Sequence, residues 1–197
     1  MRYDAEHKQR TREKVLKAAA KAIRSKGPDR IGVAEVMADA GLTHGGFYAH
    51  FESKDDLVAA AIEKMLEDSR NRLRHETEAR PPAEGLRCYI DFYLSAAHRD
   101  ARRAGCPIAA LASDLPRMSV SARKQFASGS EGLVSSLAAL LEAIGRKDPV
   151  AEARSSFAEL LGSLALARME SDEQRSDEIL ASSRASIKRR LGLDKVK

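Results

Sequence analysis

Apolar residues recur along this chain at helical spacing. In the first segment, Val15, Ala18, Ala19, Ala22 and Ile23 follow an i, i+3, i+4, i+7, i+8 pattern, which places them on one stripe of a helix. The pattern predicts a helix over about residues 8–26. No stretch shows the alternation of apolar and polar residues that marks a half-buried strand. The expected fold class is therefore all-α.

Glycine, proline and capping residues divide the rest of the chain into further predicted helices. Gly41 suits the left-handed end of a short helix, and Thr43 and Ser53 are residue types that cap the next two. Ser171 and Gln174 form the capping-box pattern of the last helix. The predicted helices after the first cover residues 33–40, 44–51, 54–80, 83–99, 107–114, 120–145, 149–169 and 171–191. We therefore expect about nine helices in total.

Two short helices joined by a glycine turn, behind a longer first helix, are typical of a helix-turn-helix unit. Gly45 and Gly46 stand near the start of its second short helix. Each glycine costs a helix interior about 1 kcal/mol relative to alanine, which favours a helix whose backbone approaches another molecule closely. We predict a helix-turn-helix domain over residues 1–54 and a larger helical body over residues 55–197.

The net charge of +5 is concentrated at the N-terminal end. Residues 1–30 contain ten Lys and Arg residues against four acids, a net charge of +6, so the remainder is close to neutral. Such asymmetry indicates an anionic partner, a nucleic acid or a membrane surface. A solvated basic helix without a partner is the alternative. The alanine-rich apolar face of the first helix is weakly suited to lipid insertion.

The composition excludes several other classes. Hydrophobic residues make up 43% of the 197 residues, enough for a packed core, and no apolar run approaches the length that spans a bilayer. The N-terminus has no apolar signal region, and two cysteines are too few for a disulfide framework. We expect a cytoplasmic protein with reduced thiols. The five histidines lack metal-site spacing and no catalytic motif is present, so no enzyme activity, metal or cofactor is expected.

The stretch AGLTHGGFYAHFESKDDL, which ends at Leu57, resembles the recognition helix and following helix start of the TetR family of bacterial transcriptional regulators. The resemblance extends over about residues 10–65. It implies that phosphate contacts come from Thr43, Tyr48, His50 and Lys54. It also implies that base edges face His44, Gly45 and Ala49. The alternatives to a DNA contact are that Tyr48 is a structural surface residue, that His50 packs within the protein, and that Lys54 is simply solvated.

One position departs from the family pattern. Family members often begin the second helix with a Thr or Ser that contacts the DNA backbone, whereas this chain has Gly32. Glycine can occupy a helix N-cap but has no hydroxyl. Lys8, Arg10 or Arg12 could supply the missing backbone contact.

The resemblance further implies a small-molecule effector pocket in the helical body. The candidate lining residues are Tyr89, Phe92, Tyr93, Cys106, Met118, Phe126 and Phe157. Aromatic residues at helical spacing also suit an ordinary core, and that alternative stays open. His98 and Arg168 could anchor an anionic group, although we expect both to be solvated.

Cys106 follows Gly105 at the start of a short predicted helix, beside Arg102 and Arg103. This resembles one branch of TetR-type regulators, some of which sense electrophiles through that cysteine. Positive charge nearby favours thiolate chemistry. A buried, inert cysteine is the alternative, and Cys88 suits an ordinary core.

Finally, the resemblance implies a homodimer formed by the last two helices, because operators have twofold symmetry. The interface candidates are Ala158, Leu161, Gly162, Ala165 and Ile187. An internal core helix with incidental small residues is the alternative. The expected function is a ligand-responsive repressor that a small molecule releases from a palindromic DNA operator. A repressor switched through Cys106 and a non-specific basic module that binds nucleic acid or membrane are the alternatives.

Overall fold

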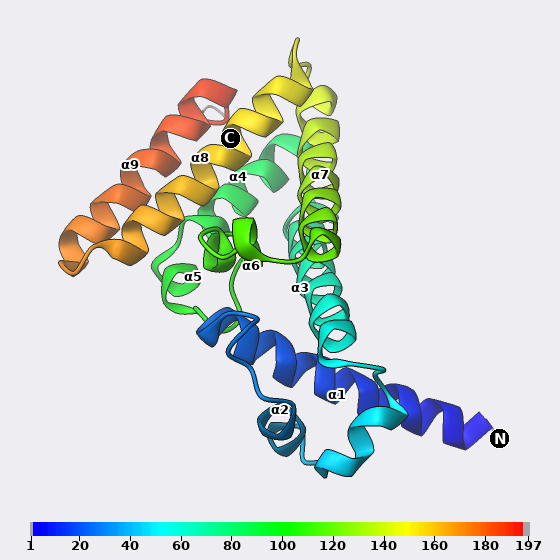
Figure 1. The fold of residues 1–197 in the computed structure, drawn as a ribbon. Coiled ribbons are helices and arrows are strands. Elements are labelled where there is room, and N and C mark those ends of the chain that lie inside the picture. The colour runs from blue at the N-terminus through cyan, green and yellow to red at the C-terminus, as the bar shows by residue number, and fades with distance from the viewer. Residues whose placement is uncertain (1, 195–197) are drawn as a thin grey trace.

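The computed structural model describes residues 2–194, with side chains from residue 6 onward. Within these residues the chain is helical and contains no strand, which confirms the predicted all-α class (Figure 1). The α-helices are α1 (Arg2–Lys26), α2 (Val33–Asp39), α3 (Lys54–Thr77), α4 (Pro82–Tyr93), α5 (Ala96–Asp100), α6 (Pro107–Leu111), α7 (Val120–Ala143), α8 (Pro149–Met169) and α9 (Glu173–Leu191). Two 3₁₀ helices, η1 (His44–Ala49) and η2 (Leu115–Arg117), complete the described part.

The N-terminal unit consists of α1, α2 and η1. The predicted apolar stripe of α1 faces the core: Val15, Ala19 and Ile23 are buried, and Ala18 and Ala22 are half-buried at its edge. Met37 of α2 and Phe47 of η1 are also buried. Gly41 adopts a φ of 75°, a left-handed conformation that residues with a side chain rarely take, and so turns the chain between α2 and η1.

The predicted second short helix forms as the 3₁₀ helix η1. The Gly46 amide donates to the Thr43 carbonyl at 3.1 Å, an i to i+3 bond. Thr43 occupies the N-cap position, but its hydroxyl makes no capping hydrogen bond. Gly45 and Gly46 lie in this segment, and glycine is a poor α-helix former. Ser53, by contrast, caps α3 as predicted and accepts from the Asp56 amide at 3.1 Å.

The long helix α3 joins the N-terminal unit to the body (Figure 1). It packs against α1 near its start and against α4 and α7 further along. Gly129 of α7 lies at the α3–α7 crossing, where an added Cβ would come within 2.6 Å of Leu66 Cδ1. The two helices therefore approach closely because α7 has no side chain at this position.

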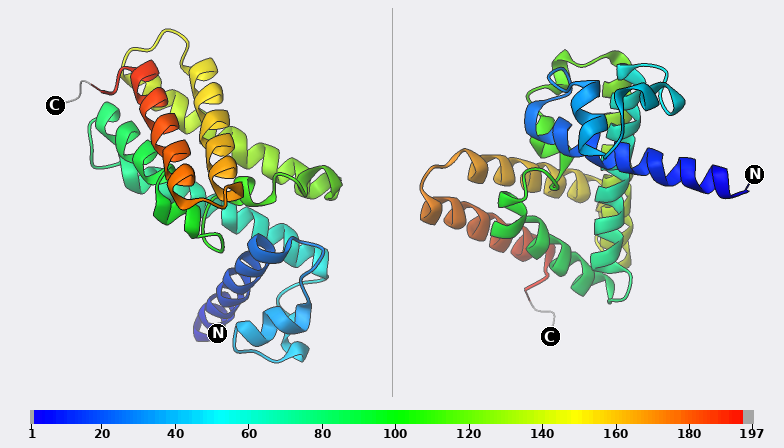
Figure 2. Two further views of the ribbon diagram at one scale, coloured as in Figure 1. Left: turned by 90° about the vertical axis from the view of Figure 1, so that its left-hand side faces the viewer. Right: turned by 90° about the horizontal axis from the view of Figure 1, so that it is seen from below.

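The helices α8 and α9 run side by side on the far side of the body from the N-terminal unit (Figure 2). Two boundaries in the body differ from the prediction. The single helix expected over residues 83–99 is broken into α4 and α5, because the Ser95 hydroxyl accepts from the His98 amide and starts a new helix. The last helix is capped by Asp172, which accepts from the Arg175 amide at 3.1 Å, and not by Ser171. Among residues 2–194, no helix has the length and apolar content needed to cross a membrane.

Candidate functional site

The segment from Thr43 to Phe51 separates a buried face from an exposed one. Phe47 and Phe51 are each 2% exposed, and their rings stack with centroids 5.7 Å apart. Tyr48 lies between them in sequence but is 73% exposed. The two buried phenylalanines hold this segment in the core, so the exposed Tyr48 side chain is available to contact another molecule.

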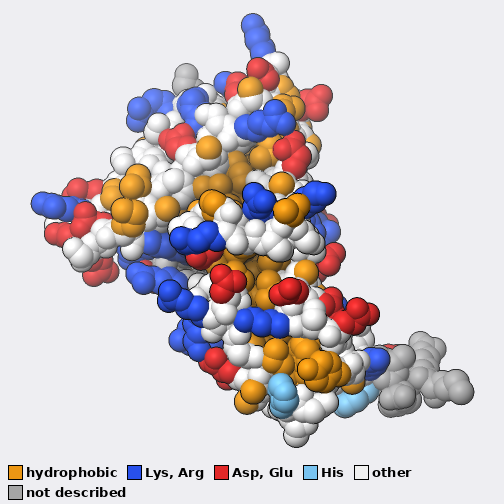
Figure 3. Space-filling model, viewed as in Figure 1, with side chains coloured by type: hydrophobic (Ala, Val, Ile, Leu, Met, Phe, Trp, Pro, Cys, Tyr) orange, Lys and Arg blue, Asp and Glu red, His pale blue; other side chains and the backbone are white. Residues whose placement is uncertain are grey.

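Most of the predicted DNA-contacting residues share this exposed surface, which we call the recognition face. It lies at the lower end of the molecule in Figures 1 and 3. Its members are Thr43, His44, Gly45, Tyr48 and Ala49, all of which are exposed. An added Cβ at Gly45 would meet nothing within 4 Å, so the face is open there.

His50 and Lys54 are less exposed than the other predicted DNA contacts, and both are half-buried. His50 is half-buried, and its Nδ1 is enclosed without a hydrogen-bond partner. Burial, with the positive charges of Lys8 and Arg12, lowers the His50 pKa. Lys54 donates from Nζ to the Asp29 carbonyl at 2.9 Å.

The basic residues of α1 flank this surface. Arg12 lies over the Phe51 ring, with Cζ 5.1 Å from the centroid, and so packs on the core. Arg10 and Lys8 are exposed on the same helix. Of the three residues considered as substitutes for the missing hydroxyl at Gly32, Arg12 thus already contacts the core through its guanidinium.

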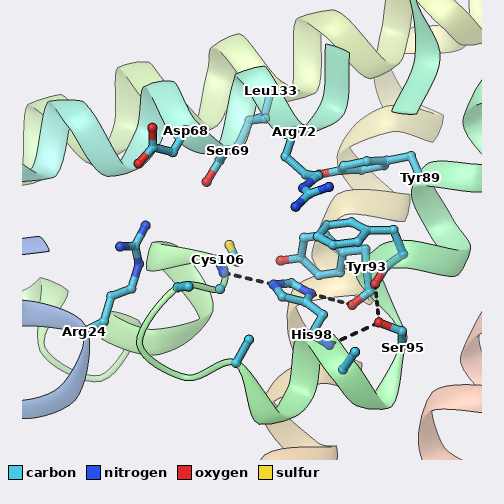
Figure 4. Close-up of a pocket in the computed structure, with 15 residues that line it drawn as sticks. Arg24, Asp68, Ser69, Arg72, Tyr89, Tyr93, Ser95, His98, Cys106 and Leu133 are labelled. Atoms are coloured by element: carbon cyan, nitrogen blue, oxygen red, sulfur yellow. Dashed lines mark hydrogen bonds between the residues drawn. The ribbon is translucent and has the colours of Figure 1, made fainter. Parts of the chain in front are cut away.

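A cavity of about 400 Å³ lies in the body between α3, α4, α5 and the segment before α6, and the end of α1 reaches it (Figure 4). Four predicted residues line this pocket: Tyr89, Phe92, Tyr93 and Cys106. Three others do not. Phe126 and Phe157 are each 3% exposed and belong to the packed core, and Met118 is half-buried before α7. Their placement in the pocket was wrong because helical spacing marks an inward side chain without distinguishing core from cavity.

His98 is buried, and Arg168 is half-buried and bonded to the backbone, so the expectation that both are solvated was wrong. His98 is 5% exposed. Its Nδ1 lies 2.7 Å from the Tyr93 carbonyl, and the Cys106 amide donates to its Nε2 at 3.0 Å. Arg168 donates from Nε and Nη2 to the carbonyls of Arg99 and His98, each at 3.1 Å. The break between α4 and α5 turns His98 inward, which a continuous helix would not do.

The two tyrosines of the pocket are neutral hydrogen-bonding groups. Burial, with the neighbouring Cys106, raises the pKa of Tyr89 and Tyr93 well above the ordinary value. The Tyr93 hydroxyl is enclosed and has no hydrogen-bond partner. In Figure 4 it points into the cavity toward Cys106. A ligand could therefore use it as a donor or an acceptor.

Sequence reasoning missed the charged residues of the pocket, which are Arg24, Asp68 and Arg72. Arg24 comes from the end of α1, and the other two come from α3. No motif marks them, because each lies among other charged residues on an amphipathic helix. Within residues 6–194, no three His, Cys, Asp or Glu side chains are grouped as a metal site.

The predicted interface residues are divided between surface and core. Ala158 and Gly162 are exposed on α8, and Leu161 and Ala165 are half-buried. Ile187 is 0% exposed within the single chain. It packs inside the body and cannot contact a second copy, so its assignment to an interface was wrong. Leu166 and Met169, which the prediction missed, are 55% and 78% exposed on α8.

Comparison with known proteins identifies the N-terminal unit. Residues 15–61 match the family model described as bacterial regulatory proteins, tetR family. The chain is 34% identical over 62 residues to an uncharacterized HTH-type transcriptional regulator, YvdT of Bacillus subtilis, covering 32% of either protein. It is 31% identical over 94 residues to the HTH-type transcriptional regulator TtgR of Pseudomonas putida, covering 48% of this chain and 44% of TtgR. The chain thus matches less than half the length of these relatives.

Solved structures extend the similarity to the whole fold. A TetR transcriptional regulator from Chloroflexus aurantiacus superposes with a TM-score of 0.81 at 25% identity, covering 95% of this chain and 96% of that one. The reduced form of Escherichia coli NemR superposes with a TM-score of 0.79 at 23% identity, covering 91% and 95% of the two chains. The second similarity concerns the fold alone.

Proposed function

The chain belongs to the TetR family, whose model matches residues 15–61 and whose fold it shares, and from this premise we propose that it is a DNA-binding transcriptional regulator. The observation that carries the proposal is the recognition face. Tyr48 is 73% exposed while its neighbour Phe47 is 2% exposed, so one short helix is anchored in the core and presents polar groups outward. Base edges and phosphates would be contacted from this face.

The charge distribution supports the same proposal. Exposed Lys8, Arg10, Lys14 and Lys17 lie on α1, and the basic excess of the chain resides in residues 1–30. Such charge draws the protein to the phosphate backbone without selecting a sequence. The exposed side chains of the recognition face would then supply base-specific contacts.

The test is selection of bound duplexes from a random DNA library at two salt concentrations. We expect a palindromic motif with half-sites about one helical turn apart or a little more. Tyr48→Ala should weaken binding to the selected duplex. Val120→Ala, a substitution at a residue that is 59% exposed in the body, is the matched control and should not. Binding that depends on salt but ignores sequence would contradict a specific regulator.

We further propose that two copies associate through α8 and its neighbour α9. The exposed face of α8 combines the small residues Ala158 and Gly162 with the large apolar residues Leu166 and Met169. An added Cβ at Gly162 would meet nothing within 4 Å, so the single chain leaves this face uncovered. Small residues let a partner helix approach closely, and the apolar ones gain from burial.

Molar mass in solution tests the dimer. Light scattering should report twice the chain mass for the native protein, and Leu166→Arg should shift the mass toward that of one chain. Val120→Arg places the same charge on an exposed site of α7 and should leave the mass unchanged. A native protein of single-chain mass would overturn the proposed interface.

The pocket supports a ligand-responsive switch. It lies between α1 of the N-terminal unit and the helices of the body, so a ligand there contacts both parts. A ligand that fits one arrangement of the two parts better than the other would change the affinity for DNA. Repression with release by a small molecule is the proposed mode.

A second candidate is a switch through the Cys106 thiol. The observation that favours it is the position of Cys106 in the wall of the same pocket, beside the Tyr93 hydroxyl (Figure 4). An electrophile in the pocket would be held close to this sulfur. Mass spectrometry after N-ethylmaleimide treatment, with Cys106→Ser as control, tests it. Loss of DNA binding that tracks modification of Cys106 would support the thiol switch.

A further inference from the structure

Among the described residues, the Arg24 guanidinium lies at one end of the pocket without a direct ion pair. Its Nε is enclosed and has no hydrogen-bond partner, and no carboxylate within the described residues forms an ion pair with it. Burial lowers the Arg24 pKa, with the Asp68 charge acting in the opposite direction. Arg24 is half-buried. A partly desolvated cation that lacks a direct partner carries a cost that a bound anion would relieve.

Asp68, the acidic residue of the pocket, is already engaged by another cation. Its Oδ1 lies 2.7 Å from Lys64 Nζ on the same helix. Arg72, the other arginine of the pocket, pairs with Glu76 at 3.3 Å. Asp68 and Arg72 therefore each have an ion-pair partner within α3, whereas Arg24 has none among the described residues and feels Asp68 only at longer range. Figure 4 shows Arg24 facing Asp68 and Ser69 across the open end of the cavity.

The other end of the pocket is aromatic. The Arg72 guanidinium lies 4.5 Å from the Phe92 centroid, and Phe92 stacks on His98 with centroids 5.1 Å apart. Tyr89 and Tyr93 add two further rings 5.8 Å apart. Flat surfaces of this kind favour a planar ligand by stacking. The unpartnered Tyr93 hydroxyl offers one polar contact at this end.

We propose that the pocket binds a small aromatic acid, with its carboxylate on Arg24 and its ring against Tyr89, Phe92 and Tyr93. A cavity of about 400 Å³ is at the small end of ligand pockets and suits one or two fused rings. The inference rests on the proposed function, and it names the ligand class and the residue through which the ligand acts. Because Arg24 belongs to α1, a carboxylate bound there would contact the first helix of the DNA-binding unit directly.

Isothermal titration of the full chain with 2-naphthoate and its neutral isostere 2-naphthamide tests the ligand class. We expect naphthoate to bind tighter by about tenfold or more, the factor that one charge-assisted hydrogen bond produces. Arg24→Gln should abolish this preference and leave naphthamide binding unchanged. Lys21→Gln removes a cation from an exposed site one turn earlier on α1 and is the matched control.

Equal affinities for the acid and the amide, or a preference that survives in Arg24→Gln, would overturn the Arg24 anchor. Failure of both compounds to bind at millimolar concentration would overturn the aromatic ligand class. The comparison of acid with amide needs only the native protein, so it stands even where Arg24→Gln folds poorly. These titrations contain no DNA, so they succeed or fail independently of the DNA-binding proposal.

The route through α1 is tested with the selected duplex. At equal occupancy of the pocket, naphthoate should lower the affinity for the duplex and naphthamide should not, because the amide leaves Arg24 without a charge partner. An equal effect of the two compounds would overturn the route through Arg24. Absence of any selective duplex would overturn the proposed regulator and leave the result of the titrations standing.

Discussion

The Cys106 amide donates to Nε2 of His98 at 3.0 Å, and this bond joins the N-cap of α6 to α5 at the wall of the pocket. The same ring lies 2.7 Å from the Tyr93 carbonyl through Nδ1. Since Nε2 accepts, the proton of the neutral ring must reside on Nδ1 and be donated to that carbonyl. The two contacts therefore require one neutral tautomer of His98, and in that form the ring links both segments of the pocket wall.

His98→Ala should lower the free energy of unfolding by about 1–3 kcal/mol, because the buried Cys106 amide and Tyr93 carbonyl lose their partner. Equilibrium urea unfolding measures the change. His75→Ala removes an exposed histidine from α3 and should change the free energy little. Equal effects of the two substitutions would contradict a structural role of His98.

The stability of the protein should also fall in mild acid. Burial, with Arg168 and Arg72 as like charges and the Tyr93 hydrogen bond opposing, lowers the His98 pKa. The unfolded chain then takes up the proton first as the pH falls. The contribution of neutral His98 is fully present above about pH 6.5 and is lost as the pH drops toward the folded-state pKa.

Urea unfolding at about pH 7.5 and about pH 5.5, on either side of the ordinary histidine pKa, should reveal this loss. His98→Gln should reduce the difference between the two conditions. The His50 pKa is also lowered, so His50→Gln serves as the comparison and separates the two contributions. A pH dependence unchanged by either substitution would assign the effect to other groups.

Gly129→Ala should destabilise the body by about 1–3 kcal/mol, the usual cost of overpacking a close helix contact. The added Cβ would come within 2.6 Å of Leu66 Cδ1, well inside van der Waals contact. Gly132→Ala is the control on the same helix, where the nearest atom lies 3.7 Å away. It should be neutral or stabilise by up to about 1 kcal/mol, because alanine favours a helix over glycine. Thermal unfolding of both variants checks the contrast.

Phe47→Ala should mainly lower stability, whereas Tyr48→Ala should mainly weaken DNA binding. Phe47 is buried and its truncation should cost about 3–5 kcal/mol of stability. Tyr48 is 73% exposed, and its truncation should change stability by no more than about 0.5 kcal/mol while weakening DNA binding. Urea unfolding and DNA titration of the two variants separate the core role from the contact role. A large stability loss in Tyr48→Ala would contradict the assignment of this side chain to the recognition face.

Ser176→Ala should lower stability by about 1–3 kcal/mol, because it breaks a buried hydrogen-bond chain. Ser176 is 2% exposed, donates to the Ala167 carbonyl at 2.7 Å and accepts from Arg99 Nη1 at 2.9 Å. This chain ties α5 to the ends of α8 and α9. Ser182→Ala, on the exposed side of α9, is the control and should have little effect. Urea unfolding again gives the comparison.

Helical periodicity and local capping were sufficient to predict the all-α class and most helix positions. The spacing of Val15, Ala19 and Ile23 defines a buried stripe regardless of what it packs against, and the bond of Ser53 to Asp56 is local. The exposure of Tyr48 was also predictable from the sequence, because burying Phe47 and Phe51 on one side of the segment turns Tyr48 toward solvent. The motif around Gly41 was specific enough to name the family.

Long-range packing determined the rest. Phe126 and Phe157 have the same inward spacing as Tyr89 and Tyr93, and only the assembled helices separate core from cavity. The break at Ser95 turned His98 inward. The end of α1 placed Arg24 in a pocket formed mostly by residues more than forty positions later in the chain. These long-range contacts depend on the angles and positions at which the helices cross, and neither hydrophobic periodicity nor local capping determines them.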